Sequence, residues 1–266
     1  MTEQAADLSQ LADTGWLCVD DAELLPWVTY VAPHAAQIAA DPDARKAWLR
    51  HGGTWFAGVN SLPNDVRGAL PGGPQLRGRV VRIAGEVFGS TPTWDAGQLS
   101  IVYPGYPRQD PGESDAAHRF RRTRDAAHVD GLLPVGPARR RMMQEPHAFV
   151  LGIPLNACAA GASPMVVWEG SHEIMRAAFR DALAQTDIGA WAQTDLTEIY
   201  QSARKHCFET CTRRIVHAQP GQAYIIHRLT LHGVAPWESG AEAPEEGRMI
   251  AYFRPAFPRA DWLTPP

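Results

Sequence analysis

The triplet His128-Val129-Asp130 combines two side chains that can bind a metal ion, and a third, His232, lies far downstream. Residues two apart in an extended segment point to the same side, so His128 and Asp130 can offer an imidazole and a carboxylate to one ion. A ligand from a distant strand would complete one face of an octahedron and leave the opposite face open. This arrangement is typical of mononuclear non-haem iron(II) sites, and it predicts a metal site at these three residues.

An arginine follows this predicted site in the sequence. The run from Pro220 to His227 predicts a turn that leads into a buried strand, and a second strand-like run, Arg248–Phe253, follows it. A dicarboxylate that chelates iron at one end leaves its other carboxylate in the pocket, where an unpaired charge is unfavourable. Arginine can bind such a group through two parallel hydrogen bonds. We therefore expect Arg248 to bind a cosubstrate.

These motifs resemble those of the phytanoyl-CoA dioxygenase-like family of iron(II)- and 2-oxoglutarate-dependent oxygenases. The resemblance covers roughly residues 98–255 and rests, in order, on His128-x-Asp130, Trp168-Glu169-Gly170-Ser171-His172, Pro220-Gly221, His232-Gly233 and Arg248. It implies that iron(II) binds to His128, Asp130 and His232. It also implies that Arg248 binds the far carboxylate of 2-oxoglutarate. The reaction would then use O2 to hydroxylate a small organic substrate and would release succinate and CO2.

One position departs from the family's pattern. Many members have Ser or Thr two residues after the distal histidine, where it helps to hold the cosubstrate, and this chain has Val234 there. The second contact to 2-oxoglutarate is therefore unassigned.

Two other classes of protein use the same kind of site. A His, Asp, His set can hold zinc or manganese and activate water in a hydrolase or isomerase with a cupin-like barrel. The barrel can also serve as a non-catalytic binding protein. Arg248 favours the oxygenase, because a hydrolase would not require it.

Composition limits the class of protein. With 266 residues, of which 45% are hydrophobic, the chain can bury one large core, so we expect a single domain over residues 1–266. The net charge of −4 predicts no binding to nucleic acid. The sequence has no apolar run of membrane-spanning length and no secretory signal, so we expect a soluble, cytoplasmic protein with reduced cysteines. The oligomeric state is open.

The predicted fold is mainly β with flanking helices, a double-stranded β-helix of the jelly-roll or cupin-like barrel type. We expect a helical and mixed part over residues 1–95, a jelly-roll core over 96–256, and a helical insertion over 171–206. The predicted strands are Arg79–Ile83, Gln98–Tyr103, His147–Ile153, Met165–Trp168, Arg213–Val216, Ala223–Leu231 and Met249–Phe253. The predicted helices are Gln4–Ala12, Asp21–Trp27, Asp41–Arg50 with Asp41 as its cap, and two in the insertion that begin at the caps Ser171 and Asp195.

A basic segment surrounds the first two predicted ligands. Residues 118–141 contain seven arginines and two aspartates, a local excess of five positive charges in a chain that is negative as a whole. These arginines either rim the pocket and attract an anionic substrate, or form a solvated surface that pairs with acidic groups. Of the other histidines, His118 in this segment is the substitute ligand if His128 is not one. His147, His172 and His217 are expected to form hydrogen bonds only, and His227 is expected to be a core group or to support a ligand rather than to bind the metal.

Overall fold

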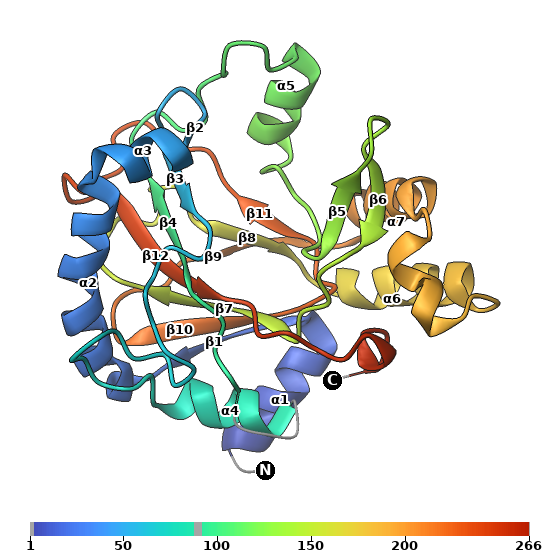
Figure 1. Cartoon of the computed structure of the whole chain (residues 1–266), viewed down its shortest axis with the longest axis horizontal. Helices are drawn as coiled ribbons and strands as arrows, with labels where there is room; N and C mark the ends of the chain where they lie inside the picture. Colours follow the sequence, from blue (N-terminus) through green and yellow to red (C-terminus); the bar gives the residue numbers. More distant parts are fainter. Residues whose placement is uncertain (1–2, 88–91, 266) are drawn as a thin grey trace.

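Two antiparallel sheets form the centre of the structure, a computed structural model that describes residues 3–87 and 92–265 (Figure 1). The larger sheet has the strand order β1-β10-β7-β12-β4-β3-β2, and the smaller has the order β11-β8-β9. A hairpin, β5–β6, stands beside them. The strands of the larger sheet are β1 (Trp16–Asp20), β2 (Leu49–Arg50), β3 (Trp55–Gly58), β4 (Gln98–Val102), β7 (Phe149–Pro154), β10 (Gln222–His227) and β12 (Arg248–Phe253). The others are β5 (Leu132–Val135), β6 (Arg140–Met143), β8 (Met165–Trp168), β9 (Arg213–Val216) and β11 (His232–Val234).

Helices cover the outer faces of both sheets. In Figure 1, α1, α2 and α4 lie beside the larger sheet, α6 and α7 lie on the right, and α5 lies at the top. No helix of the described residues is both long enough and apolar enough to span a membrane. The helices are α1 (Glu3–Thr14), α2 (Leu25–Ala40), α3 (Pro42–Trp48), α4 (Arg79–Val87), α5 (Asp115–Thr123), α6 (Ser171–Leu183) and α7 (Thr197–Thr210), with short 3₁₀ turns at Ala22–Leu24, Ile188–Gln193 and Arg259–Asp261.

The alternation of side chains along β12 divides the core. Met249, Ala251 and Phe253 pack in a cluster with the helices on the outer face of the larger sheet. Ile250 and Tyr252 point the other way, into a cluster that contains residues of both sheets. A third cluster joins the smaller sheet to α6, α7 and the β5–β6 hairpin. The space between the two sheets is therefore enclosed by β12 on one side and by the smaller sheet on the other.

The predicted strands in the centre of the chain are confirmed, but the first one is wrong. β8 and β9 have the predicted bounds, and the other central strands overlap their predictions. Residues Arg79–Ile83 instead begin the helix α4. Their β-branched residues favour a strand, but the buried positions Val80, Ile83 and Ala84 recur at helical spacing. The carboxylate of Asp21 also accepts a hydrogen bond from the backbone N–H of Val80, at 2.8 Å, a cap from a distant segment that no local pattern reveals.

Helix starts were predicted with mixed success. Asp41 caps α3 as predicted, since its side chain accepts a hydrogen bond from the N–H of Ala44. Ser171 does not cap α6. The cap residue is Gly170, and Ser171 Oγ instead donates to the carbonyl of Trp168 and accepts from the N–H of Leu231 at 2.8 Å. The Ser171 hydroxyl therefore ties the start of α6 to the segment that carries His232. Asp195 precedes the cap of α7 and binds Thr197.

The second predicted helix is much longer than expected. The prediction ended at Trp27, whereas the 3₁₀ turn Ala22–Leu24 continues into α2, which ends at Ala40. The alanine-rich second half of α2 packs Val31, Ala35 and Ala39 on the larger sheet.

Two buried histidines make the stability of the fold dependent on pH. The rings of His172 and His227 lie 5.1 Å apart, centroid to centroid. Burial lowers the pKa of His172 and holds that of His227 well below its usual value, so both rings are neutral in the folded protein. In the unfolded chain the same rings take up protons below about pH 6.5. The unfolded state then binds more protons, so the free energy of unfolding falls as the pH is lowered from about 6.5.

We predict that each ring contributes a loss of at most about 1.4 kcal/mol between pH 7.5 and 5.5. Urea unfolding at the two pH values measures this loss. His227→Gln should reduce it, whereas His206→Gln, a change at an exposed position on α7, should leave it as in the wild type. An equal loss in wild type and His227→Gln would contradict this account.

Candidate metal centre

The backbone brings the two distant histidines together. The N–H of His128 donates to the carbonyl of His232 at 2.8 Å, and the N–H of His232 donates to the carbonyl of His128 at 3.0 Å. Their rings lie 4.8 Å apart, centroid to centroid. Asp130 is two residues beyond His128 and turns its carboxylate toward the same point, as the sequence predicted.

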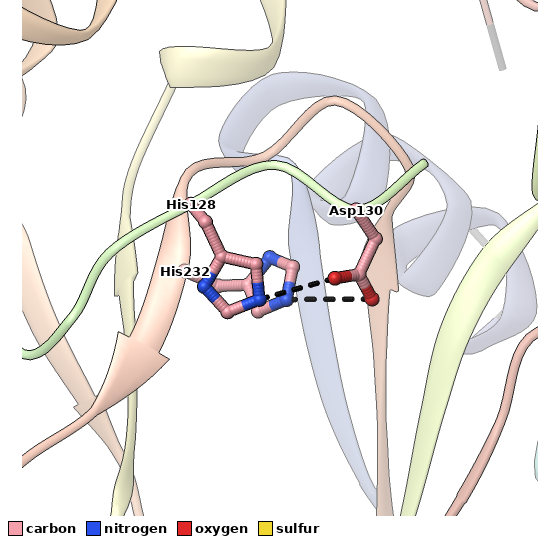
Figure 2. A group of neighbouring side chains, drawn as sticks. All are labelled: His128, Asp130 and His232. Carbon is pink, nitrogen blue, oxygen red and sulfur yellow. Dashed lines mark ion pairs between the residues drawn. The ribbon is translucent and has the colours of Figure 1, made fainter. Parts of the chain in front are cut away.

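Figure 2 shows the carboxylate of Asp130 facing the Nε2 atoms of both rings. Its Oδ1 lies 3.1 Å from Nε2 of His128, and its Oδ2 lies 3.8 Å from Nε2 of His232. One ligand atom from each of the three residues lies within 4.8 Å of the others. Among the described residues, this is the one group of three or more potential ligands with such close spacing.

Backbone carbonyls fix the tautomer of both imidazoles. Nδ1 of His128 lies 3.0 Å from the carbonyl oxygen of Ala126, and Nδ1 of His232 lies 2.9 Å from that of Thr230. A carbonyl oxygen can only accept, so each Nδ1 carries the proton and donates it. The lone pair of each neutral ring is then on Nε2, the atom that faces Asp130. The arrangement therefore fits a metal ion, because both rings present an unprotonated nitrogen to the same point.

The site is buried on the side of His232 and Asp130 and open to solvent on the side of His128. The side chain of His232 is 4% exposed and that of Asp130 is 13% exposed, but that of His128 is 52% exposed. Burial is the main reason that the pKa of His232 falls to about 4, although the negative charge of Asp130 acts to raise it. His232 therefore stays neutral and able to bind a metal throughout the physiological range of pH.

Arg254 is a residue of this site that the sequence analysis missed. Its Nε donates to Oδ2 of Asp130 at 2.5 Å, and its Nη1 donates to Oε1 of Gln98 at 2.7 Å. Burial alone would raise the pKa of Asp130, but the guanidinium of Arg254 outweighs it and holds that pKa well below its usual value. The sequence did contain a clue to Arg254. It lies six residues after Arg248, and residues an even number apart along an extended segment share a face.

Arg248 lies at the other end of β12 from the three predicted ligands. It is 4% exposed, and its Nε and Nη2 have no hydrogen-bond partner within the part of the chain that the structure describes. It lines a small pocket between the sheets whose other walls are Cys158, Pro164, Val216, His217, Ala218, Tyr224 and Ile250. A buried guanidinium with free donors is unfavourable by itself, so this pocket suits an anionic group.

The turn before His128 is strained and is held by an ion pair. Asp125 and Ala126 have φ values of 54° and 53°, in the left-handed region that residues other than glycine rarely adopt. The buried carboxylate of Asp125 accepts two hydrogen bonds from Arg213 on β9, at 2.8 and 2.9 Å. The carbonyl of Asp125 accepts a third from the N–H of Val234. The strained turn that presents His128 is therefore attached to both β9 and β11.

The other histidines are not part of this group. His118 lies on α5, with its Nδ1 3.6 Å from Oε2 of Glu113, so it does not replace His128. The rings of His172 and His227 face each other, His217 contacts the carbonyl of Cys158, and His147 lies 3.9 Å from a carboxylate oxygen of Glu145.

Several arginines of the basic segment have partners within the protein. Arg121 pairs with Glu113, Arg140 pairs with Asp195, and Arg124 stacks on the ring of Phe208. For these three, the structure supports the interpretation as paired surface groups. Arg119, Arg122 and Arg139 are exposed.

Comparisons with known proteins show the fold. No family model matches the sequence, and no curated protein sequence does. The chain is similar in structure to the epimerase SnoN, solved with Fe3+, alpha ketoglutarate and nogalamycin RO (16% identity, TM-score 0.51, 95% of this chain and 83% of that one). It is also similar to SnoK, a non-heme alpha ketoglutarate dependent carbocyclase from nogalamycin biosynthesis (14%, TM-score 0.52, 96% and 83%).

A third similar structure is that of EctD from S. alaskensis with bound Fe (13%, TM-score 0.50, 96% and 76%). The fold is thus one found in non-haem, alpha-ketoglutarate-dependent enzymes, in agreement with the resemblance seen in the sequence. The predicted class of fold, mainly antiparallel sheet with flanking helices, is confirmed.

The pair formed by Asp125 and Arg213 yields a test of the turn. Arg213→Gln should destabilise the protein by about 1–2 kcal/mol, because it leaves the buried Asp125 carboxylate without its main partner. The matched control is Arg214→Gln on the same strand, since Arg214 is 57% exposed and pairs with Glu169 at the surface. Urea unfolding measures both. Equal stability of the two variants would show that the ion pair of Asp125 with Arg213 does not hold the turn.

Proposed function

We propose that this protein is an iron(II)- and 2-oxoglutarate-dependent oxygenase with His128, Asp130 and His232 as its metal ligands. The observation that carries the proposal is the convergence of two Nε2 lone pairs and one carboxylate on a single point, from one triplet and one distant residue of the chain. Two imidazoles and one carboxylate on one face are the ligand set of non-haem iron(II) oxygenases. The half-exposed ring of His128 leaves the opposite side accessible to a small organic substrate.

Arg248 supports 2-oxoglutarate as the cosubstrate. Its buried Nε and Nη2 lack partners, and a carboxylate in the same pocket would accept from both. Position 234 is valine and cannot donate a hydrogen bond, but the hydroxyl of Tyr224 lines this pocket too and makes a 2.8 Å hydrogen bond to the hydroxyl of Tyr252. We therefore infer that Tyr224 takes the place of the Ser or Thr that many family members have. A hydrolase or isomerase would leave these donors unused.

Iron with bound 2-oxoglutarate activates O2 for the oxidation of a C–H bond, with release of succinate and CO2. The protein's own part is to hold the ligands, to neutralise the far carboxylate with Arg248 and to keep water from the space between the sheets with apolar residues such as Ile250 and Val167. We propose hydroxylation as the outcome. An epimerase and a carbocyclase have similar folds, so the fold alone does not fix the product.

The proposed architecture is a jelly roll in one domain. We infer that the two sheets are the halves of a double-stranded β-helix, because the sheets enclose one mixed cluster and β11 and β12, consecutive strands, belong to different sheets. Residues 1–95 and the insertion 171–206 would then support this core from outside. In this proposal the protein binds a small-molecule substrate, 2-oxoglutarate and O2.

The metal ligands can be tested by removing the carboxylate. Asp130→Ala should lower the affinity for iron(II) by more than about 100-fold and abolish succinate formation that depends on substrate, because one of three ligands is lost. Anaerobic titration with iron(II) and 2-oxoglutarate, followed by the visible charge-transfer band of the chelate, measures binding. A wild-type protein without this band, or an Asp130→Ala variant that keeps it, would exclude the proposed site.

Arg248 can be tested separately from the metal. Arg248→Met should weaken the binding of 2-oxoglutarate by about 10–100-fold, the effect expected for losing hydrogen bonds from a charged group, and should leave the affinity for iron(II) alone unchanged. The same titration gives both values. Unchanged binding of 2-oxoglutarate would show that its far carboxylate lies elsewhere.

A further inference from the structure

Arg254 makes the shortest contact with any proposed ligand. Its Nε lies 2.5 Å from Oδ2 of Asp130, while Oδ1 of the same carboxylate faces Nε2 of His128. The two oxygens of Asp130 therefore have different surroundings. Oδ2 is bound to a guanidinium and lies 3.8 Å from Nε2 of His232, whereas Oδ1 has no contact with the guanidinium's Nε and lies 3.1 Å from Nε2 of His128.

The position of Arg254 is itself restrained from three sides. Its Nη1 donates to Oε1 of Gln98 on β4 at 2.7 Å, and its backbone N–H donates to Oδ1 of Asp95 at 2.9 Å. Its guanidinium carbon lies 5.7 Å from the centre of the ring of Tyr252. The guanidinium cannot follow Asp130 if the carboxylate turns, so the carboxylate is held in one orientation.

From these contacts we infer that Arg254 is a positioning residue that holds Asp130 as a ligand through one oxygen, Oδ1. The inference rests on the proposed metal site. A cation that also bound Oδ2 would lie close to a guanidinium already on that oxygen, and the two positive charges repel. With one protein oxygen in use, an octahedral ion keeps three positions for other ligands.

Charge leads to a second consequence. The guanidinium of Arg254 neutralises the charge of the Asp130 carboxylate. The two charges of iron(II) then have no net counter-charge among these groups, which favours an anionic chelating cosubstrate.

Titration with Co²⁺, a spectroscopic substitute for iron(II), tests the role of Arg254 without catalysis. Arg254→Met should lower the affinity for Co²⁺ by about 10–100-fold, as expected for the loss of a group that orients a metal ligand. It should also change the visible Co²⁺ spectrum, because the freed carboxylate can turn both oxygens to the ion. Arg254→Lys should be intermediate, since an ammonium retains the charge but not the planar donor group.

The control is Arg214→Met, an exposed arginine that should leave affinity and spectrum unchanged. Arg254→Met with wild-type affinity and spectrum, while Asp130→Ala abolishes binding, would overturn the role of Arg254 and leave the metal site intact. Binding that survives in Asp130→Ala would overturn both. If Arg254→Met does not fold, as judged by circular dichroism, the Gln98→Leu variant provides the test, because it removes one restraint on Arg254. A several-fold loss of Co²⁺ affinity in Gln98→Leu supports the proposal. Wild-type affinity in that variant overturns it.

Discussion

The negative charge of Asp130 is the constraint on which the rest of the site depends. A carboxylate that is largely withdrawn from water must be compensated, and here the compensation comes from Arg254, the residue that follows β12. Arg254 is fixed in turn by Gln98, and the two imidazoles are fixed by backbone carbonyls. The result is a compensated carboxylate beside two rings whose unprotonated nitrogens face it.

β12 divides the interior because its two faces pack against different parts of the protein. The outward residues pack against helices, whereas Arg248, Ile250, Tyr252 and Arg254 share the face toward the smaller sheet. One strand therefore places a guanidinium at each end of the enclosed space. Arg254 neutralises the charge of Asp130, the proposed metal ligand. At the other end, Arg248 has buried donors that suit an anion, and apolar and tyrosine side chains lie between the two arginines.

The segment before His128 shows how the fold maintains an unfavourable backbone at a functional position. Two consecutive residues with positive φ cost free energy, and the ion pair of the buried Asp125 with Arg213 offsets that cost. The pairing of the His128 and His232 backbones then sets the distance between the rings. Local strain, an ion pair and two backbone hydrogen bonds together align the ligands.

The sequence by itself predicted that His128, Asp130 and His232 would lie together, and it predicted most of the central strands, because residue type, spacing and alternation are local properties of the chain. It did not determine that Arg79–Ile83 would form a helix, because a cap from Asp21 and burial against the sheet outweigh the strand preference of its valines. Nor did it reveal Arg254, Gln98 and Arg213 as supports of the ligands. Only the tertiary structure decides such partners, since contacts between residues about 90 to 160 positions apart depend on which strands pair and in which register.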